Sequence, residues 1–211
     1  MILKHNYWWF KSVIKESVCD DIVNYAKTLK DEMATTGKID DFSDINIEDI
    51  NVKDLKKTRD SNVTFIDKSW IYELIIPYID LANKNADWNF DWDFLEECQF
   101  TKYKKGQHYD WHCDSWDHPY DNPNDPQEHG KIRKLSVTLN LSDPKDYTGG
   151  ELEFDFNDGG PIADSKRYLC KDILPKGSMV VFPSHVWHRV KPVTSGERNS
   201  LVIWNLGYPF K

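Results

Sequence analysis

The spacing of apolar residues changes near residue 87, from helical periodicity to short alternating runs. Apolar residues from Val18 to Met33 recur three and four positions apart, which predicts an amphipathic helix. Ser17 is the expected N-cap of this helix, and Gly37 is expected to end it. An aromatic-rich run in residues 5–14 precedes the helix and predicts a first strand.

A second helix is predicted from a cap at Ser69 to about Asn83, with a kink at Pro77. Between the two helices, residues 38–58 are polar and lack a clear period, so we expect a loop there, followed by a short strand over residues 62–66. The inward face of the second helix is expected to comprise Trp70, Leu74, Ile75, Tyr78, Ile79 and Ala82.

After residue 87 the chain consists of short alternating runs separated by turn residues, which is typical of a sandwich or barrel. Strands are predicted over residues 88–94, 96–104, 108–113, 134–141, 150–156, 166–172, 178–182, 186–191 and 198–206. We therefore predict an α+β fold whose core is a double-stranded β-helix, or jelly roll, with the two helices packed on the outer face of one sheet. The 211 residues are expected to form one domain, with supporting strands and helices in 1–95 and the jelly roll in 96–207.

Composition narrows the classes of partner and location. Lys and Arg number 27 against 35 Asp and Glu, which gives a net charge of −8, so nucleic acid is not an expected partner. No apolar run approaches the ~20 residues that a membrane span requires, and the N-terminus lacks the pattern of a secretory signal. The 4 cysteines lack metal-type spacing and are expected to be reduced thiols, so the protein is predicted to be cytoplasmic.

A candidate metal site lies at the end of the predicted strand 108–113. His112 and Asp114 are two positions apart, so on a strand both side chains leave the same face, about 7 Å apart. A second histidine would complete the triad of two histidines and one carboxylate that is typical of non-haem Fe(II) oxygenases. His188, on a later predicted strand, and His185, three residues before it, are both available as the third ligand.

A candidate anion site lies on the last predicted strand. Arg198, Ser200 and Trp204 share one face of it, because residues two apart on a strand point the same way. A guanidinium beside a hydroxyl can bind a carboxylate, with the arginine donating two parallel hydrogen bonds. The alternative is that Arg198 pairs with an Asp or Glu at the rim of the barrel, and the residues alone leave both interpretations open.

Four sequence motifs occur together between residues 96 and 207. They are Tyr103, Gly106, Tyr109, His112 and Asp114; Arg133, Leu135 and Ser136; Gly149, Gly150, Glu151, Leu152 and Phe154; and the segments Phe182 to Ser184 and His188 to Arg198. In combination they resemble the motifs of the 2-oxoglutarate- and Fe(II)-dependent dioxygenases, in the PKHD-type branch that is similar to prolyl 4-hydroxylases and includes bacterial and phage hydroxylases. Residues 1–95 match that family only in general architecture.

The resemblance implies a set of iron ligands. These are His112, Asp114 and His188, so the resemblance selects His188 over His185. Tyr109 also matches the family motif, but it is not expected beside His112, because strand alternation places it on the other face.

The resemblance also implies how the cosubstrate is bound. Arg198 would bind the distal carboxylate of 2-oxoglutarate, with Tyr103 donating a hydrogen bond to the same group and Ser200 assisting. Tyr103 is alternatively a plain core aromatic. Trp204 either lines the substrate side of the site or belongs to the core.

The implied activity is hydroxylation of an unactivated C–H bond, coupled to oxidative decarboxylation of 2-oxoglutarate to succinate and CO₂. The implied cofactors are Fe(II), 2-oxoglutarate and O₂, with ascorbate as a further candidate in the role of reductant. Family analogy favours a prolyl or other side chain of a peptide or protein, and a small molecule or free amino acid is the alternative substrate. A non-catalytic metal-binding jelly roll, acting as a sensor or binding module, is the alternative function.

Overall fold

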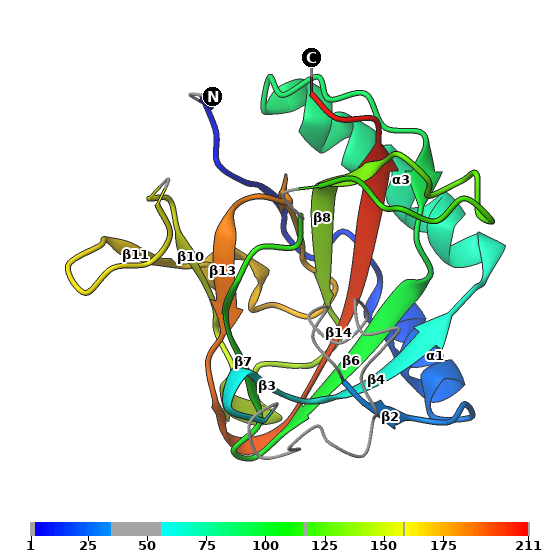
Figure 1. The fold of residues 1–211 in the computed structure, drawn as a ribbon. Helices are drawn as coiled ribbons and strands as arrows, with labels where there is room; N and C mark the ends of the chain where they lie inside the picture. Colours follow the sequence, from blue (N-terminus) through cyan, green and yellow to red (C-terminus); the bar gives the residue numbers. More distant parts are fainter. Residues whose placement is uncertain (1–2, 35–55, 116–117, 158, 211) are drawn as a thin grey trace, which may run out of the picture.

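The chain folds into two β-sheets that face each other, with helices against one of them (Figure 1). The structure is a computed structural model that describes residues 3–34, 56–115, 118–157 and 159–210. The larger sheet contains, in spatial order, β1 (Trp8–Phe10), β12 (Met179–Pro183), β8 (Ile132–Asn140), β14 (Val193–Gly207), β6 (Cys98–Lys104), β4 (Asn62–Ile66) and β2 (Glu32–Met33), while β5 (Phe94–Leu95) and β9 (Tyr147–Gly149) also pair with β14. The smaller sheet contains β11 (Arg167–Leu169), β10 (Leu152–Asp155), β13 (Trp187–Val190), β7 (His108–His112) and β3 (Arg59–Asp60).

Helices α1 (Glu16–Ala26) and α3 (Ser69–Asn85) pack against the outer face of the larger sheet (Figure 1). Their apolar side chains and those on the outer face of the sheet form one core cluster. Its fully buried members include Ile22, Ile71, Ile75, Ile79, Leu135, Leu139, Met179 and Leu201. The predicted jelly roll with helices on one sheet is therefore confirmed. None of the described helices has the length and apolar character that crossing a bilayer requires.

Helix α1 begins and ends at other residues than predicted. The residue before it is Lys15, which makes no side-chain capping bond, so the expected N-cap at Ser17 is wrong. The helix ends at Ala26, because Thr28 donates both its backbone N–H and its hydroxyl to the Tyr25 carbonyl oxygen and so interrupts the helical hydrogen bonds.

The segment after α1 also differs from the prediction. Met33 was expected on the helix but lies in β2 and is exposed. Strand β3 was not predicted at all, since its two residues follow a segment without apolar period. Gly37 and most of the loop predicted over residues 38–58 lie outside the described residues.

Helix α3 buries three of the six residues predicted to face inward, Ile75, Ile79 and Ala82, and in addition buries Ile71. It begins at Ser69 itself, after Lys68, and it passes through Pro77. Trp70 was expected to face inward but is 39% exposed. The buried positions Ile71, Ile75, Ile79 and Ala82 are spaced by four, four and three residues, and this stripe sets the helix orientation against the sheet.

Most of the remaining strands lie where alternation predicts them, but β9 was not predicted and three predicted strands differ in their bounds. Within the predicted strand 88–94 only the last residue is in a strand, β5. The predicted strand 166–172 is β11 followed by a short 3-10 helix, η2 (Lys171–Ile173). Strand β14 begins at Val193 and continues through Gly196, in the interval between the predicted strands 186–191 and 198–206, because residues 193–196 pair with β9 before the strand continues between β6 and β8.

Candidate metal centre

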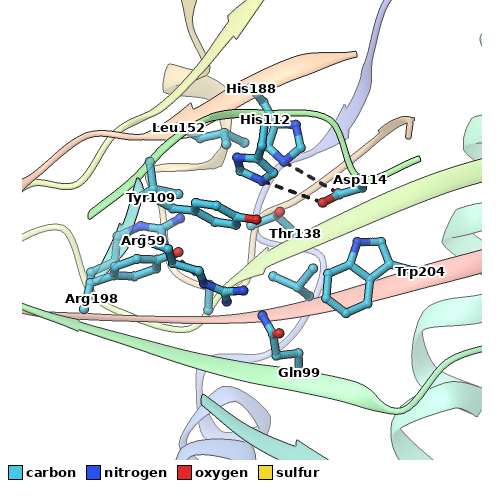
Figure 2. Close-up of a pocket in the computed structure, with 14 residues that line it drawn as sticks. Arg59, Gln99, Tyr109, His112, Asp114, Thr138, Leu152, His188, Arg198 and Trp204 are labelled. Carbon is cyan, nitrogen blue, oxygen red and sulfur yellow. Dashed lines mark hydrogen bonds and ion pairs between the residues drawn. The ribbon is translucent and has the colours of Figure 1, made fainter. Parts of the chain in front are cut away.

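The two histidines selected by the resemblance lie opposite each other on the smaller sheet. His112 is the last residue of β7, and His188 is its partner in the antiparallel register of β13. Their imidazole centroids are 4.1 Å apart, and both residues line the pocket between the sheets (Figure 2). His188 is buried, whereas His185 is exposed after the end of β12, so the structure brings His188 and not His185 to this site.

Asp114 was expected to share a strand with His112, but it lies beyond the end of β7. The chain bends there because the backbone N–H groups of Asp114 and Ser115 both donate to the Ser184 carbonyl oxygen. The bend places the Asp114 carboxylate 3.7 Å from Nε2 of His112 and 3.5 Å from Nε2 of His188. The potential ligand atoms of the three residues lie within 4.8 Å of one another, which is close enough for one metal ion.

The hydrogen bonds of the two imidazole rings show which nitrogen faces the carboxylate. Nδ1 of His112 lies 2.7 Å from the Asp110 carbonyl oxygen, and Nδ1 of His188 lies 3.0 Å from that of Val186. A carbonyl oxygen only accepts hydrogen bonds, so in the neutral rings each Nδ1 carries the proton and each Nε2 presents a lone pair. Two lone pairs and a carboxylate therefore converge without a hydrogen between them, and a cation is the group that fits this space.

The charges of the site match metal binding. Burial acts to raise the pKa of the Asp114 carboxyl, but charge interactions with His188, His112 and Arg133, together with a hydrogen bond, lower it by more, and the resulting pKa is about 2. The Ser136 hydroxyl contributes by donating a hydrogen bond of 2.7 Å to Oδ2 of Asp114. Burial, and after it the neighbouring His188, holds the pKa of His112 well below its ordinary value. A charged carboxylate and a neutral imidazole are the forms that bind a divalent metal.

The carboxylate clamp expected from the sequence (Arg198, Ser200 and Tyr103) lies in the same pocket. Arg198 is 2% exposed and donates from Nη1 to Ser200 Oγ at 3.3 Å. Tyr103 is opposite Arg198 on β6, and its ring centroid lies 5.6 Å from the guanidinium carbon. Within the described part of the chain no carboxylate forms an ion pair with Arg198, so the alternative of a rim ion pair finds no support.

Arg59 is a pocket residue that the sequence did not predict. It lies on β3 opposite Tyr109, with its guanidinium carbon 4.5 Å from the centroid of that ring. Its Nε donates to Ser61 Oγ at 3.1 Å, and Ser61 is also hydrogen-bonded to the Tyr103 hydroxyl. Burial raises the pKa of Tyr103, so the hydroxyl keeps its proton. A second guanidinium therefore lies beside the clamp, on a strand too short to show a sequence pattern.

Tyr109 faces the pocket, although alternation predicted the opposite face. Strand β7 pairs His112 with His188 and Tyr109 with Val190, so it contains one more residue than β13 over this interval. The bulge brings Tyr109 onto the same face as His112, where the two rings stack with centroids 3.5 Å apart. The expected exclusion of Tyr109 from the site is therefore wrong.

Comparison with known families agrees with this geometry. The profile of the 2OG-Fe(II) oxygenase superfamily matches residues 98–205, about half of the 211 residues. The chain belongs to this superfamily. Among relatives of this oxygenase, a PKHD-type hydroxylase of Pseudoalteromonas atlantica is 36% identical over 107 residues, which cover 50% of this chain and 41% of that protein. A PKHD-type hydroxylase of Hyphomonas neptunium is 46% identical over 85 residues, or 40% of this chain and 34% of that protein.

The matches to these two relatives therefore span less than half of the relatives' own length. Solved structures share the fold of the oxygenase over nearly its whole chain. The viral collagen prolyl hydroxylase of Paramecium Bursaria Chlorella virus-1 has a TM-score of 0.62 at 19% identity, covering 97% of both chains. A prolyl hydroxylase of Trichoplax adhaerens, in complex with a peptide fragment of the hypoxia inducible factor oxygen degradation domain, has a TM-score of 0.60 at 15% identity, covering 96% of this chain and 84% of that chain. At these identities the likeness shows the jelly-roll fold.

Proposed function

We propose that this oxygenase is an Fe(II)- and 2-oxoglutarate-dependent hydroxylase. The observation that carries the proposal is the convergence of His112, Asp114 and His188 in one pocket with the guanidinium of Arg198. Two histidines and one carboxylate on one side of a metal leave coordination positions open for other ligands. A buried arginine in the same pocket then supplies a partner for the remote carboxylate of a cosubstrate.

His112 and His188 would bind Fe(II) through Nε2, and Asp114 would bind it through one carboxylate oxygen. The carbonyl groups of Asp110 and Val186 fix both rings in this orientation through Nδ1. When bound, Fe(II) supplies the redox chemistry that couples decarboxylation of 2-oxoglutarate, to succinate and CO₂, with transfer of an oxygen atom from O₂ to a C–H bond.

The clamp binds and orients the cosubstrate. Arg198 donates to the distal carboxylate of 2-oxoglutarate, and Ser200 holds the guanidinium by accepting from Nη1. The Tyr103 hydroxyl donates to the same carboxylate, since burial keeps it protonated. The positive charge of Arg59, next to Tyr103, adds to the attraction for a dianion at these buried side chains.

The class of substrate is also part of the proposal. Relatives of the chain are PKHD-type hydroxylases, and two proteins with the same fold are prolyl hydroxylases, one of them solved with a peptide. We therefore propose a prolyl or other peptidyl side chain as the substrate. Tyr109, Leu152 and Val190 present mainly apolar surface near the metal ligands, which suits an unactivated C–H group. Ascorbate as a reductant stays a prediction.

The proposal is tested by succinate formation from 2-oxoglutarate in the presence of Fe(II), O₂ and a blocked proline peptide. His112→Ala and Asp114→Ala should each abolish turnover, since each removes one ligand. Asp110→Asn is the matched control, because the Asp110 side chain is exposed and only its backbone carbonyl contacts His112. Wild-type turnover in both alanine variants would refute the metal site.

A further inference from the structure

Trp204 carries a buried hydrogen-bond donor without an acceptor. Its side chain is 7% exposed, and among the described residues nothing accepts from its Nε1–H. In the described part of the chain three other buried side-chain atoms lack partners, on Trp111, Asn199 and Asn205, but of these four residues only Trp204 lines the pocket between the sheets. An unpaired buried donor costs about 1–3 kcal/mol, so a donor that faces a ligand pocket points to an acceptor on the ligand.

The position of Trp204 separates this donor from the carboxylate clamp. Arg198 and Trp204 are six residues apart on β14, which corresponds to about 20 Å along a strand. The four carbon–carbon bonds of 2-oxoglutarate span no more than about 6 Å. A cosubstrate whose distal carboxylate is bound by Arg198 therefore extends over only part of the separation along the strand. Figure 2 shows the indole on the Asp114 side of the pocket, with Arg198 and Tyr109 on the other side. In the register of β14 and β8 Trp204 is opposite Ser136, the residue that donates to Asp114.

Neighbouring side chains hold the indole in place. One of them lies at a second bulge, in β8. In β8 the register with β14 passes from Leu135 to Arg133 over a single step of β14, so Lys134 is the extra residue. The bulge places the Arg133 guanidinium 3.8 Å from the centroid of the Trp204 ring. Arg133 donates from Nε to Glu96 at 2.6 Å.

Tyr120, from the segment between β7 and β8, adds a second contact to this group, because its hydroxyl donates to Glu96 at 3.1 Å. The two hydrogen bonds fix the Glu96 carboxylate, which offsets the charge of Arg133. The fixed carboxylate in turn holds the Arg133 guanidinium over the indole. The Nε1–H of Trp204 thus has a set direction before any ligand binds, which is the condition for a specific contact.

We propose that the Trp204 Nε1–H binds the substrate, by donating to a neutral carbonyl oxygen of a peptide next to the hydroxylated side chain. The charge around the indole favours a neutral acceptor. Glu96 pairs with Arg133 and offsets its charge, so the cation over the indole gives a substrate carboxylate little attraction. An amide carbonyl accepts the hydrogen bond without needing such a cation. The inference rests on the proposed function and selects peptides over free amino acids.

The indole N–H can be observed directly by NMR with ¹⁵N-labelled tryptophan. Zn(II) in place of Fe(II) allows 2-oxoglutarate and peptide to bind without turnover, and the probe is an acetyl- and amide-blocked proline pentapeptide. The Trp204 resonance is assigned by its loss in Trp204→Phe. If that variant does not fold, Mn(II) at the same site assigns it instead, because the paramagnetic ion broadens the nearest indole most.

The peptide should shift the Trp204 Nε1–H resonance downfield and slow its exchange with solvent, whereas Zn(II) and 2-oxoglutarate alone should leave it in place. Trp204→Phe keeps a ring under Arg133 and should bind the peptide about three- to tenfold more weakly, as for the loss of one hydrogen bond. Trp70→Phe, on the surface of α3, is the matched control and should bind the peptide normally.

Three outcomes would overturn the inference. A shift caused by 2-oxoglutarate alone would assign the donor to the cosubstrate. Peptide binding that moves other resonances but not that of Trp204 would remove Trp204 from substrate recognition. Binding of free L-proline but not of the blocked peptide would overturn the substrate class. Failure of Zn(II) and 2-oxoglutarate themselves to bind would instead count against the proposed function.

Discussion

Asp114, which follows β7 of the smaller sheet, is held before any metal binds by residues on or next to strands of the larger sheet. Its Oδ2 accepts from Ser136 on β8, and its backbone N–H donates to the Ser184 carbonyl oxygen, just after β12. The two serine hydroxyl oxygens are 2.9 Å apart, so they also position each other. A residue beyond the end of its strand therefore has a defined orientation, which the spacing of His112 and Asp114 in the sequence did not explain.

Ser136→Ala tests this support. The variant keeps all three ligands but removes the donor to Oδ2, so the affinity for Fe(II) should fall about 10- to 100-fold. Isothermal titration with Fe(II) under anaerobic conditions measures the change. Ser178→Ala is the matched control, because Ser178 is equally buried and its hydroxyl, among the described residues, accepts only from the backbone N–H of Ser12, away from the site. Equal affinities in the two variants would show that Ser136 does not support the ligand.

Arg198→Ala tests the clamp. Removal of the guanidinium should raise the dissociation constant of 2-oxoglutarate about 100-fold, since it removes a charged, bidentate contact. The affinity for the metal should be nearly unchanged. Arg189→Ala, which removes an arginine paired with Glu153 on β10, is the control for loss of a cation. An unchanged dissociation constant for 2-oxoglutarate in Arg198→Ala would exclude Arg198 from the clamp.

At the scale of whole elements, alternation predicted most strands but failed where a bulge is present. His188 as the third ligand and the role of Tyr103 came from the family resemblance, whereas the nearness of His112 to Asp114, the common face of Arg198 and Ser200, and the helices on the larger sheet followed from residue spacing. Tyr109 and the Arg133–Trp204 contact did not, because one extra residue in β7 and one in β8 change which face the next side chain occupies. Arg59 was missed because a two-residue strand is defined by its partner β7 and not by its own sequence.

Gly196 marks the point where β14 changes partners from β9 to β6 and β8. Its φ is +73°, and a Cβ there would lie 1.9 Å from the Asp146 carbonyl oxygen. Gly196→Ala should therefore reduce the free energy of unfolding by about 3 kcal/mol or more. Gly106 also has a positive φ, +89°, but has open space around its Cβ position, so Gly106→Ala should cost only about 1 kcal/mol. Equal losses in urea unfolding would mean that close packing at Gly196 has no effect.

At the scale of the whole molecule, the site is supported by two hydrophobic clusters, neither of which contains a metal ligand. One cluster joins the helices to the outer face of the larger sheet, and the other includes Phe154, Phe182 and Val180. The jelly roll as a whole was predictable, since strand alternation and the helical stripes reflect these clusters. The boundaries of the helices were not, because local hydrogen bonds such as that of Thr28 decide them.

Removal of the metal should therefore leave the fold intact. Chelation takes away only the free energy of metal binding, about 3 kcal/mol at a metal concentration of about 100 times Kd, so the melting temperature should fall by about 5–10 °C. Unfolding should remain cooperative when followed by circular dichroism. Loss of the cooperative transition on chelation would show that the two clusters do not hold the sheets together without the metal.

The proposed function requires one pocket to bind both Fe(II) and 2-oxoglutarate. Anaerobic addition of Fe(II) and then 2-oxoglutarate to the purified apo-protein tests it most directly, by the weak visible charge-transfer band that forms when the cosubstrate chelates the metal. The band should appear with one equivalent of each in the wild-type protein and be lost in Asp114→Ala, and admission of O₂ should then yield succinate. A folded wild-type protein that gives neither band nor succinate would contradict the account.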